Sequence, residues 1–230
     1  MTRRLIRFVC LSDTHSQPLQ VSVPSGDVLL HTGDFSRSGS AETVAGFNAW
    51  LQSLPHAYKV VIAGNHEHTF HAANWPMLKE RYKHDFALFD AKKLLTAAIY
   101  LENSACEVFG YRVWGSPWIR ADRPGAFTKQ ADEDLEAVYG EFRGPVDILM
   151  THGPAYAVLD CNTEGKCQGS KVLSRLVERV KPLVHVCGHI HEAYGEQITP
   201  DAVTLSLNAA TCSVAYEALN SPLVFDLPAR

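Results

Sequence analysis

Several short apolar runs in the sequence lead directly into side chains that could bind a metal ion or transfer a proton. The side chains that follow these runs are Asp13, His15, Asp34, Asn65, His66, His152, His189 and His191. Carboxylate, amide and imidazole groups are the donors of hydrolytic sites that hold two divalent metal ions. One such side chain alone is weak evidence, but a whole series of them, each at the end of an apolar run, predicts one shared metal site.

Nitrogen and oxygen donors without a thiolate suit Mn²⁺, Fe or Zn²⁺ and do not suit Cu(I). We therefore expect two divalent metal ions, with Mn²⁺ as the metal and Fe or Zn²⁺ as the alternatives.

The apolar runs are predicted to be buried β-strands, because they are short and rich in β-branched residues. They cover residues 8–12, 28–33, 60–64, 148–151 and 184–188. Ligands of α/β proteins gather beyond the carboxyl ends of such strands. Side chains two residues apart on an extended segment face the same way, so Asp13 and His15 are predicted to reach one ion. The same spacing lets His189 and His191 reach one ion.

Other segments predict the elements around these strands. Helices are expected at residues 40–54, 74–83, 130–142 and 170–180. Further strands are expected at residues 97–101, 106–109, 111–114, 203–207 and 223–225, the first three forming an antiparallel hairpin. Two sets of strands with helices outside them imply two stacked sheets. With 230 residues, 46% of them hydrophobic, residues 1–230 are expected to form a single domain.

The composition bears on partners and location. A net charge of −4 offers no basic face for long nucleic acid or an anionic membrane. No apolar stretch reaches the length of about 18 residues that a membrane-spanning helix needs. The run at residues 5–11 is interpreted as the first strand and not as a targeting segment. We therefore expect a cytoplasmic protein with no membrane partner.

The six cysteines are expected to be reduced in that compartment. Cys161 and Cys167 flank a loop that contains glycine and lysine, and they are the pair expected to oxidise most readily.

The order of the motifs resembles the calcineurin-like metallophosphoesterase superfamily. The motifs are Asp13-x-His15, Gly33-Asp34, Gly64-Asn65-His66-Glu67, His152 and Gly188-His189-x-His191. A closer similarity, to the metallophosphoesterase-domain-containing group of class III phosphodiesterase-like proteins, rests on residues 114–118, 151–154 and 191–195. The resemblance spans residues 5–210 and implies a four-layer αββα sandwich of two mixed β-sheets flanked by helices, with metals at the sheet edge.

Carried over by motif, the resemblance implies a first metal held by Asp13, His15, Asp34 and His191. It implies a second metal held by Asp34, Asn65, His152 and His189, with Asp34 bridging the two. A hydroxide between the metals would attack phosphorus, and His66 would be the general acid that protonates the leaving oxygen. The residues expected to be catalytic are His66, Asn65 and Asp34.

The sequence departs from one branch of this superfamily. Protein Ser/Thr phosphatases carry a Gly-Asp-x-x-Asp-Arg-Gly block, whose second aspartate orients the general-acid histidine. Residues 33–38 here read Gly-Asp-Phe-Ser-Arg-Ser, so that aspartate is absent. The departure argues against a protein phosphatase and leaves the orienting partner of His66 unassigned.

Other side chains have weaker claims to a role. Arg37 and Arg120 could hold a second phosphate, and Glu67 is expected to brace its turn. Trp114 and Trp118 could stack a nucleobase or cap the core beneath a loop, and the sequence leaves both interpretations open.

The remaining histidines divide into three groups. His31 and His185 are expected in the core or behind the metal ligands, and His68 and His71 are candidates to line the mouth of the site. His56 and His84 are expected on the surface.

These observations predict a dinuclear metal-dependent phosphodiesterase that hydrolyses small phosphodiesters, cyclic nucleotides included. The partner expected is therefore a small-molecule phosphodiester, and the sequence leaves the oligomeric state open. A phosphomonoesterase of the same fold and a non-catalytic scaffold that keeps the fold are the alternatives.

Overall fold

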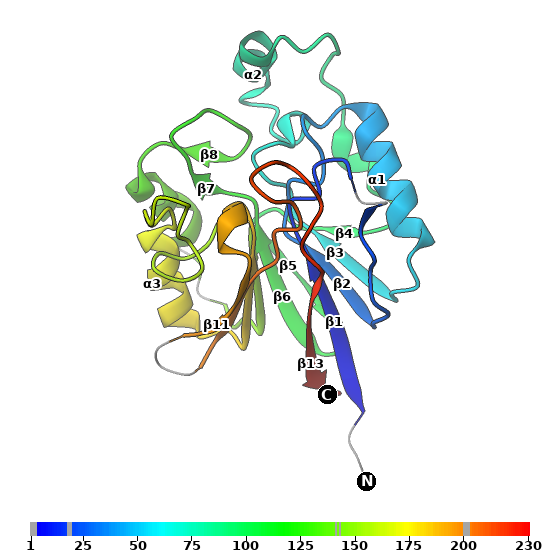
Figure 1. Ribbon diagram of the computed structural model, residues 1–230, viewed down its shortest axis with the longest axis vertical. Coiled ribbons are helices and arrows are strands. Elements are labelled where there is room, and N and C mark those ends of the chain that lie inside the picture. The colour runs from blue at the N-terminus through cyan, green and yellow to red at the C-terminus, as the bar shows by residue number, and fades with distance from the viewer. Residues whose placement is uncertain (1–3, 18–19, 141, 143, 200–202) are drawn as a thin grey trace.

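The computed structural model describes residues 4–17, 20–140, 142, 144–199 and 203–230. Two large β-sheets pack face to face, and α1 and α3 lie on their outer faces (Figure 1). The predicted αββα arrangement of two mixed sheets is confirmed.

The first sheet has the strand order β13-β1-β2-β3-β4. Its strands are β1 (Leu5–Leu11), β2 (Val28–His31), β3 (Tyr58–Val61), β4 (Ile99–Tyr100) and β13 (Leu223–Pro228). The strands β1 to β4 run parallel, and β13 pairs antiparallel with β1. The loops that follow β1, β2 and β3 therefore leave the sheet at the same edge.

The second sheet has the order β11-β12-β10-β9-β6-β5. Its strands are β5 (Ser104–Val108), β6 (Tyr111–Ser116), β9 (Ile148–Thr151), β10 (Val184–Cys187), β11 (Gly195–Ile198) and β12 (Leu205–Asn208). Two short strands, β7 (Ile119–Arg120) and β8 (Thr128–Lys129), pair separately. The predicted hairpin is correct for β5 and β6, but wrong for the first run, because β4 pairs with β3 in the other sheet.

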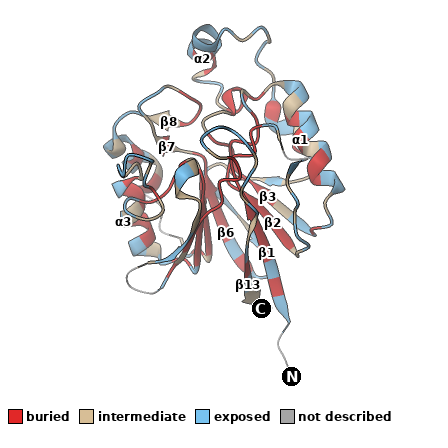
Figure 2. Cartoon of the chain, in the orientation of Figure 1, coloured by how far each residue is buried: buried red, intermediate tan, exposed pale blue. Residues whose placement is uncertain are grey.

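The core lies between the two sheets, whose strands are largely buried (Figure 2). Strand residues such as Phe8, Val60 and Val186 are fully buried there. α1 (Ala41–Ser53) covers the first sheet, and α3 (Lys171–Val180) covers the second. Ser40 and Ser170 cap these helices by accepting hydrogen bonds from backbone N–H groups three residues later. Both helices begin where the sequence predicts, and so does α2 (Trp75–Tyr82).

The helix predicted at residues 130–142 is wrong in type. The chain forms a 3₁₀ turn (Asp132–Leu135) that runs into a π-helical turn (Glu136–Gly140). The carboxylate of Asp132 accepts hydrogen bonds from the Ser170 hydroxyl and from the backbone N–H groups of Lys171 and Val172. This contact ties the segment to the start of α3, and a tertiary contact of this kind overrides local helix preference.

The structure places the remaining tryptophan and histidine side chains whose positions the sequence predicts or leaves open. Trp114 is 4% exposed and packs in the core cluster beneath α3. Trp118 is half-buried and packs on Phe127 at the edge of the core. Both positions favour the interpretation that these side chains cap the core. His56 is 2% exposed, so its predicted surface position is wrong. His84 is half-buried and stacks on Trp75.

Among the described residues, no helix combines the length and the apolar character needed to cross a bilayer.

Candidate metal centre

The residues that follow β1, β2, β3, β9 and β10 converge at one edge of the sandwich. The two sheets meet there, since Ser12, which follows β1, and Ala210, which follows β12, form an isolated parallel β-bridge. His152 after β9 also donates from Nδ1 to the carbonyl oxygen of Thr32 after β2, over 2.8 Å. The parallel direction of these strands delivers all the predicted metal-binding side chains to this one place.

The side chains form two groups that share a boundary. The ligand atoms of Asp13, His15 and His191 lie within 4.8 Å of one another, and so do those of Asp34, His152 and His189. Asn65 joins the second group, since its Oδ1 lies 3.0 Å from His152 Nε2. Asp34 also groups with His15 and His66, so it stands between the two clusters. The arrangement matches the ligand sets that the resemblance implies, and metal binding by these residues stays a prediction.

The prediction that side chains two residues apart reach the same ion is correct for one pair and wrong for the other. Asp13 and His15 do share a group, but His189 and His191 fall into different groups. Asp13, His15 and His189 have φ values of 53°, 43° and 69°, in the left-handed region and not in the extended one. Strand alternation therefore does not apply, and sharp turns aim each side chain. Backbone strain of this kind concentrates at functional sites.

The Asp13 carboxylate tests whether these residues suit a cation. Its Oδ2 accepts a 2.8 Å hydrogen bond from the His189 backbone N–H. Its Oδ1 is buried and makes no hydrogen bond with any described residue, although His191 Nε2 lies 3.3 Å away. The Nε2 atoms of His15 and His191 are also 3.3 Å apart. A buried carboxylate oxygen that accepts no hydrogen bond is costly. A divalent cation would satisfy these three atoms together, so the residues fit the expected metal.

Backbone carbonyls set the orientation of two of the imidazoles. His152 Nδ1 contacts the Thr32 carbonyl oxygen, and His191 Nδ1 contacts the Ser213 carbonyl oxygen at 2.9 Å. Since a carbonyl only accepts, each Nδ1 donates and each Nε2 faces the centre. This second contact is the usual arrangement behind a metal-binding histidine.

The pKa values of the imidazoles fall into two classes. Burial lowers the pKa of His15 to about 4 and that of His189 to about 3, so both are neutral near pH 7. Burial also opposes the charged form of His152 and His191. The nearby carboxylates of Asp34 and Asp13 outweigh it and raise the pKa of each to about 9. In the metal-free protein these two protons balance two buried carboxylates, and a bound cation would replace them.

Glu67 braces the loops that carry the ligands, as predicted. Its carboxylate is fully buried and accepts hydrogen bonds from the backbone N–H groups of Asp34, Ser36 and Gly64, at 2.7 to 2.9 Å. The Ser36 hydroxyl donates to it as well. One side chain thus joins the loop after β2 to the loop after β3, and it fixes Asp34 relative to Asn65.

Replacing Glu67 by glutamine should lower the free energy of unfolding by about 1–3 kcal/mol, because at least one buried N–H loses its acceptor. Urea denaturation of the metal-free protein measures this change. Glu107→Gln is the control, because Glu107 lies exposed on β5. If both variants unfold at the same urea concentration, Glu67 is not a brace.

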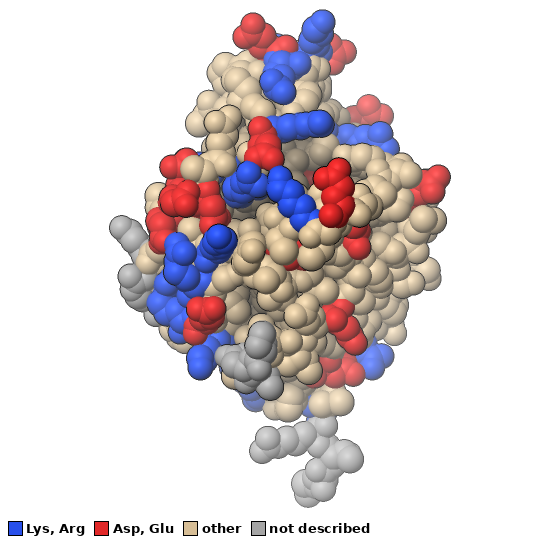
Figure 3. Space-filling view, turned by 60° about the vertical axis from the view of Figure 1, so that its left-hand side comes forward, with Lys and Arg blue, Asp and Glu red and all other residues tan. Residues whose placement is uncertain are grey.

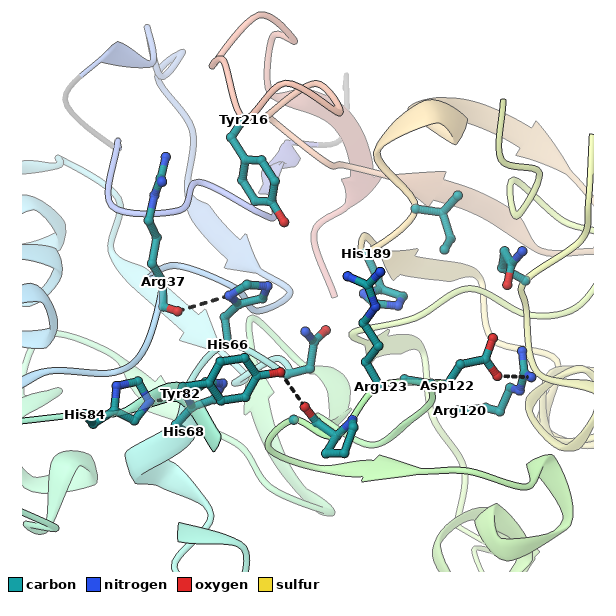
Figure 4. Close-up of a pocket in the computed structure, with 16 residues that line it drawn as sticks. Arg37, His66, His68, Tyr82, His84, Arg120, Asp122, Arg123, His189 and Tyr216 are labelled. Atoms are coloured by element: carbon teal, nitrogen blue, oxygen red, sulfur yellow. Dashed lines mark hydrogen bonds and ion pairs between the residues drawn. The ribbon is translucent and has the colours of Figure 1, made fainter. Parts of the chain in front are cut away.

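His66 finds its orienting partner in the main chain. Its Nδ1 lies 3.1 Å from the carbonyl oxygen of Arg37 (Figure 4). Arg37 occupies the position at which the Ser/Thr phosphatase block has its second aspartate. The carbonyl can only accept, so Nδ1 donates and Nε2 faces the centre, 4.0 Å from Asp34 Oδ2. A side-chain pattern cannot reveal a main-chain acceptor, which is why the sequence left this partner unassigned.

A cavity of about 560 Å³ opens beside the metal centre, and His66 and His189 form part of its wall (Figure 4). Of the predicted lining residues, Arg37, Arg120 and His68 do line it, as does His84. His71 instead packs against Trp118 and Phe127.

Three further residues of this wall have no signature in the sequence, namely Arg123, Gln168 and Tyr216. Each comes from a different loop with no periodic pattern. The ring of Tyr216 lies 4.7 Å from that of His15, so the loop before β13 closes one side of the centre.

His31 and His185 lie behind the centre. His31 Nε2 contacts the Thr14 hydroxyl at 3.1 Å, and His185 Nε2 contacts the Thr151 hydroxyl at 2.8 Å. Both are fully buried, as expected for residues that support the ligand loops.

Comparison with known proteins agrees with this geometry. Residues 6–193 match the family model described as calcineurin-like phosphoesterase. The chain is 40% identical to human metallophosphoesterase domain-containing protein 1, over 96% of this chain and 71% of that protein. It is 35% identical to a UPF0046 protein of Caenorhabditis elegans, over 97% of this chain and 81% of that one. The crystal structure of TT1561 of Thermus thermophilus shares the fold, with a TM-score of 0.56 at 14% identity over 99% of this chain and 100% of that one.

Proposed function

The chain belongs to the calcineurin-like phosphoesterase family, and on that basis we propose that it is a phosphodiesterase acting on small soluble phosphodiesters, cyclic nucleotides included. Family membership supports a metal-dependent hydrolase of phosphoric esters. The observation that carries the proposal is the position of Asp34 between two ligand groups, with the His66 imidazole beside it at the cavity.

Each residue of the centre has a proposed role, either in holding a metal ion or in moving a proton. Asp13, His15 and His191 would hold one ion, Asn65, His152 and His189 a second, and Asp34 both. Two divalent ions, when bound, supply charge stabilisation for the phosphoryl oxygens and a nucleophile at neutral pH. His66 holds a proton at Nε2 for the leaving oxygen, and the Arg37 carbonyl keeps that atom directed toward the centre.

The surroundings of the site support a small diester. The cavity of about 560 Å³ is large enough to take a substituent on the phosphate beyond the reacting atoms. Acidic and basic side chains are interspersed over the face in Figure 3, which supports a small substrate over long nucleic acid. We propose Mn²⁺ as the metal, with Fe or Zn²⁺ as alternatives, and the cytoplasm as the location.

The test compares a diester with a monoester. Chelator-stripped protein is assayed on bis-p-nitrophenyl phosphate and on p-nitrophenyl phosphate, with Mn²⁺, Fe²⁺ or Zn²⁺ added back. We expect metal-dependent turnover with higher kcat/KM on the diester, lost in Asn65→Ala and kept in Asn48→Ala, whose side chain caps a distant turn. A preference for the monoester would select a phosphomonoesterase. Folded protein with no turnover under any metal would favour a scaffold.

Two guanidinium groups in the cavity wall have no carboxylate partner among the described residues. Arg120 is neutralised by Asp122, at 2.5 Å, whereas Arg123 and Arg37 form no ion pair there. The Arg37 guanidinium lies over the Tyr216 ring, 5.5 Å from its centre. Arg123 and His189 both line the cavity (Figure 4). An anionic group that extends from the reacting phosphate into this cavity would meet the Arg123 guanidinium.

Replacing Arg123 by alanine should therefore raise KM about tenfold for a dinucleotide with a terminal phosphate, since a hydrogen bond between charged groups contributes about 1.5 kcal/mol. KM for the same dinucleotide without that phosphate should change less than about twofold. Steady-state kinetics on the two substrates measures the difference. Arg175→Ala serves as the control, because Arg175 pairs with Glu136 on the outer side of α3. An equal rise for both dinucleotides would mean that Arg123 does not read the second phosphate.

A further inference from the structure

Cys161 and Cys167 face each other across a short loop between β9 and α3. Their Sγ atoms are 3.9 Å apart, and neither belongs to a disulfide. Cys161 is exposed and Cys167 is half-buried, so small oxidants in solvent can reach the pair.

The backbone around this pair has the geometry that a disulfide requires. Cys161 and Cys167 form an isolated antiparallel bridge. The hydrogen bonds flank the pair, from Asn162 N to Lys166 O at 3.1 Å and from Gln168 N to Asp160 O at 3.0 Å. The cysteines therefore occupy a non-hydrogen-bonded position, where opposing Cα atoms are typically about 4.5 Å apart. This spacing lies within the range that disulfides span, so side-chain rotation alone could form the S–S bond.

The loop is held in place by contacts that do not involve the thiols. Asp160 Oδ2 accepts hydrogen bonds from the backbone N–H groups of Ala157 and Gly169, both at 3.0 Å. Asn162 Oδ1 accepts from the backbone N–H groups of Glu164 and Lys166. Because these contacts fix both sides of the loop, the backbone can keep one conformation whether the two cysteines are reduced or joined.

We propose that Cys161 and Cys167 form a reversible intramolecular disulfide, a redox modification site on the loop that leads to Gln168 in the cavity wall. The cross-link would tie the residue before Gln168 to the opposite side of the loop. The proposal does not depend on the hydrolytic activity.

Oxidation by a peroxide gives a balanced reaction. The Cys161 sulfur, the more exposed one, attacks a peroxide oxygen, and the O–O bond breaks to give a sulfenic acid. The Cys167 sulfur then attacks the Cys161 sulfur, the S–O bond breaks, and water leaves with the proton of Cys167. Two thiols lose two electrons to hydrogen peroxide, and two waters form in total. Desolvation and the hydrogen bond to Cys161 raise the pKa of Cys167, so its thiolate forms less readily, and the more exposed Cys161 is the sulfur that meets the peroxide first.

A bound metal is the competing explanation for this cluster. The ligand atoms of Asp160, Cys161 and Cys167 lie within 4.8 Å of one another. Structural zinc sites use four protein ligands, however, and this cluster offers three. One of them, Asp160, has its Oδ2 engaged by two backbone N–H groups, and only its Oδ1 faces Cys161 Sγ, at 3.9 Å. The disulfide is therefore the better account, and zinc retention becomes an outcome of the test.

The other cysteines provide a matched control. Cys10, Cys187 and Cys212 are buried. Cys106 is half-buried on β5, and burial raises the pKa of its thiol to about 11. It should therefore react far more slowly than the pair in the loop.

The test uses the full, metal-loaded chain, treated with hydrogen peroxide or with glutathione buffers of rising potential. Free thiols are blocked, and tryptic peptides are identified by mass. Trypsin cuts after Lys166, between the two cysteines, so only a disulfide keeps the two peptides joined. We expect these linked peptides, their separation by dithiothreitol, unchanged behaviour of Cys106→Ser, and loss of the link in Cys167→Ser with a glutathione or sulfenic adduct on Cys161.

Three results would overturn the proposal. The first is a pair of mixed glutathione disulfides, on Cys161 and on Cys167, at every buffer ratio. The second is a link between other cysteines. The third is stoichiometric zinc on wild-type protein that is absent from Cys161→Ser, together with no S–S link after the zinc is removed.

Discussion

Replacing Asp34 by asparagine is expected to lower kcat/KM on a phosphodiester by about 10³-fold while the chain stays folded. Among the described residues, Asp34 is the one carboxylate that lies in two ligand groups, one with His152 and His189 and one with His15 and His66. Asparagine keeps the shape but removes the charge that both ions need. Losing about 4 kcal/mol of charge stabilisation in the transition state corresponds to a factor of this size.

Metal content gives this prediction a second readout. Asp34→Asn should retain at most one ion per chain by elemental analysis, and its melting temperature should respond less to added Mn²⁺ than that of the wild-type protein. Asp27→Asn is the matched control, because Asp27 accepts from the Arg7 backbone and pairs with Arg4, at the end of β1 opposite the metal centre. Two ions and unchanged kinetics in Asp34→Asn would refute the bridging role.

The parallel strands that lead into the metal centre, and the convergence of the side chains that follow them, were predictable from the sequence because a single physical rule governs both. A parallel strand buried on both faces is a nearly continuous apolar run, so residues such as Val60 and Ile148 mark these strands in the sequence. The carboxyl ends of parallel strands meet at one edge, which brings Asp13, Asp34 and His152 together before any coordinates are known.

What the sequence could not predict depends on turns and on the main chain. The positive φ values of Asp13 and His189 place neighbouring ligands in ways that strand alternation cannot anticipate. Residues 130–142 look like one α-helix by composition, but they form a 3₁₀ turn and a π-helical turn, and the Asp132 carboxylate binds the first backbone N–H groups of α3. Every residue has a backbone carbonyl, so the Arg37 carbonyl that orients His66 leaves no signature in the sequence.

The cavity wall was hidden for another reason. Arg123, Gln168 and Tyr216 come from three separate loops, and only the folded chain brings them to one cavity. Loops carry much of the specificity of enzymes but little periodic signal, so this part of the site needs a structure.

Replacing His66 by glutamine is expected to lower kcat by about 10²- to 10⁴-fold, the usual range for a lost general acid. The loss should depend on the leaving group. It should be large for diesters with an alkoxide leaving group, which needs a proton, and small for nitrophenolate, which does not. Metal content should stay at two ions, since His66 is not among the predicted ligands. Turnover of a series of diesters with leaving groups of different pKa measures the trend.

Two variants separate proton transfer from other roles of this region. His71→Gln should behave as wild type, because His71 packs against Trp118 and Phe127 away from the centre. Arg37→Ala should keep the wild-type dependence on the leaving group, because the main-chain oxygen that orients His66 survives the substitution. If His66→Gln instead slows all diesters equally or loses a metal ion, His66 acts as a ligand and not as the acid. If Arg37→Ala reproduces the leaving-group trend of His66→Gln, the Arg37 side chain and not its carbonyl positions the imidazole.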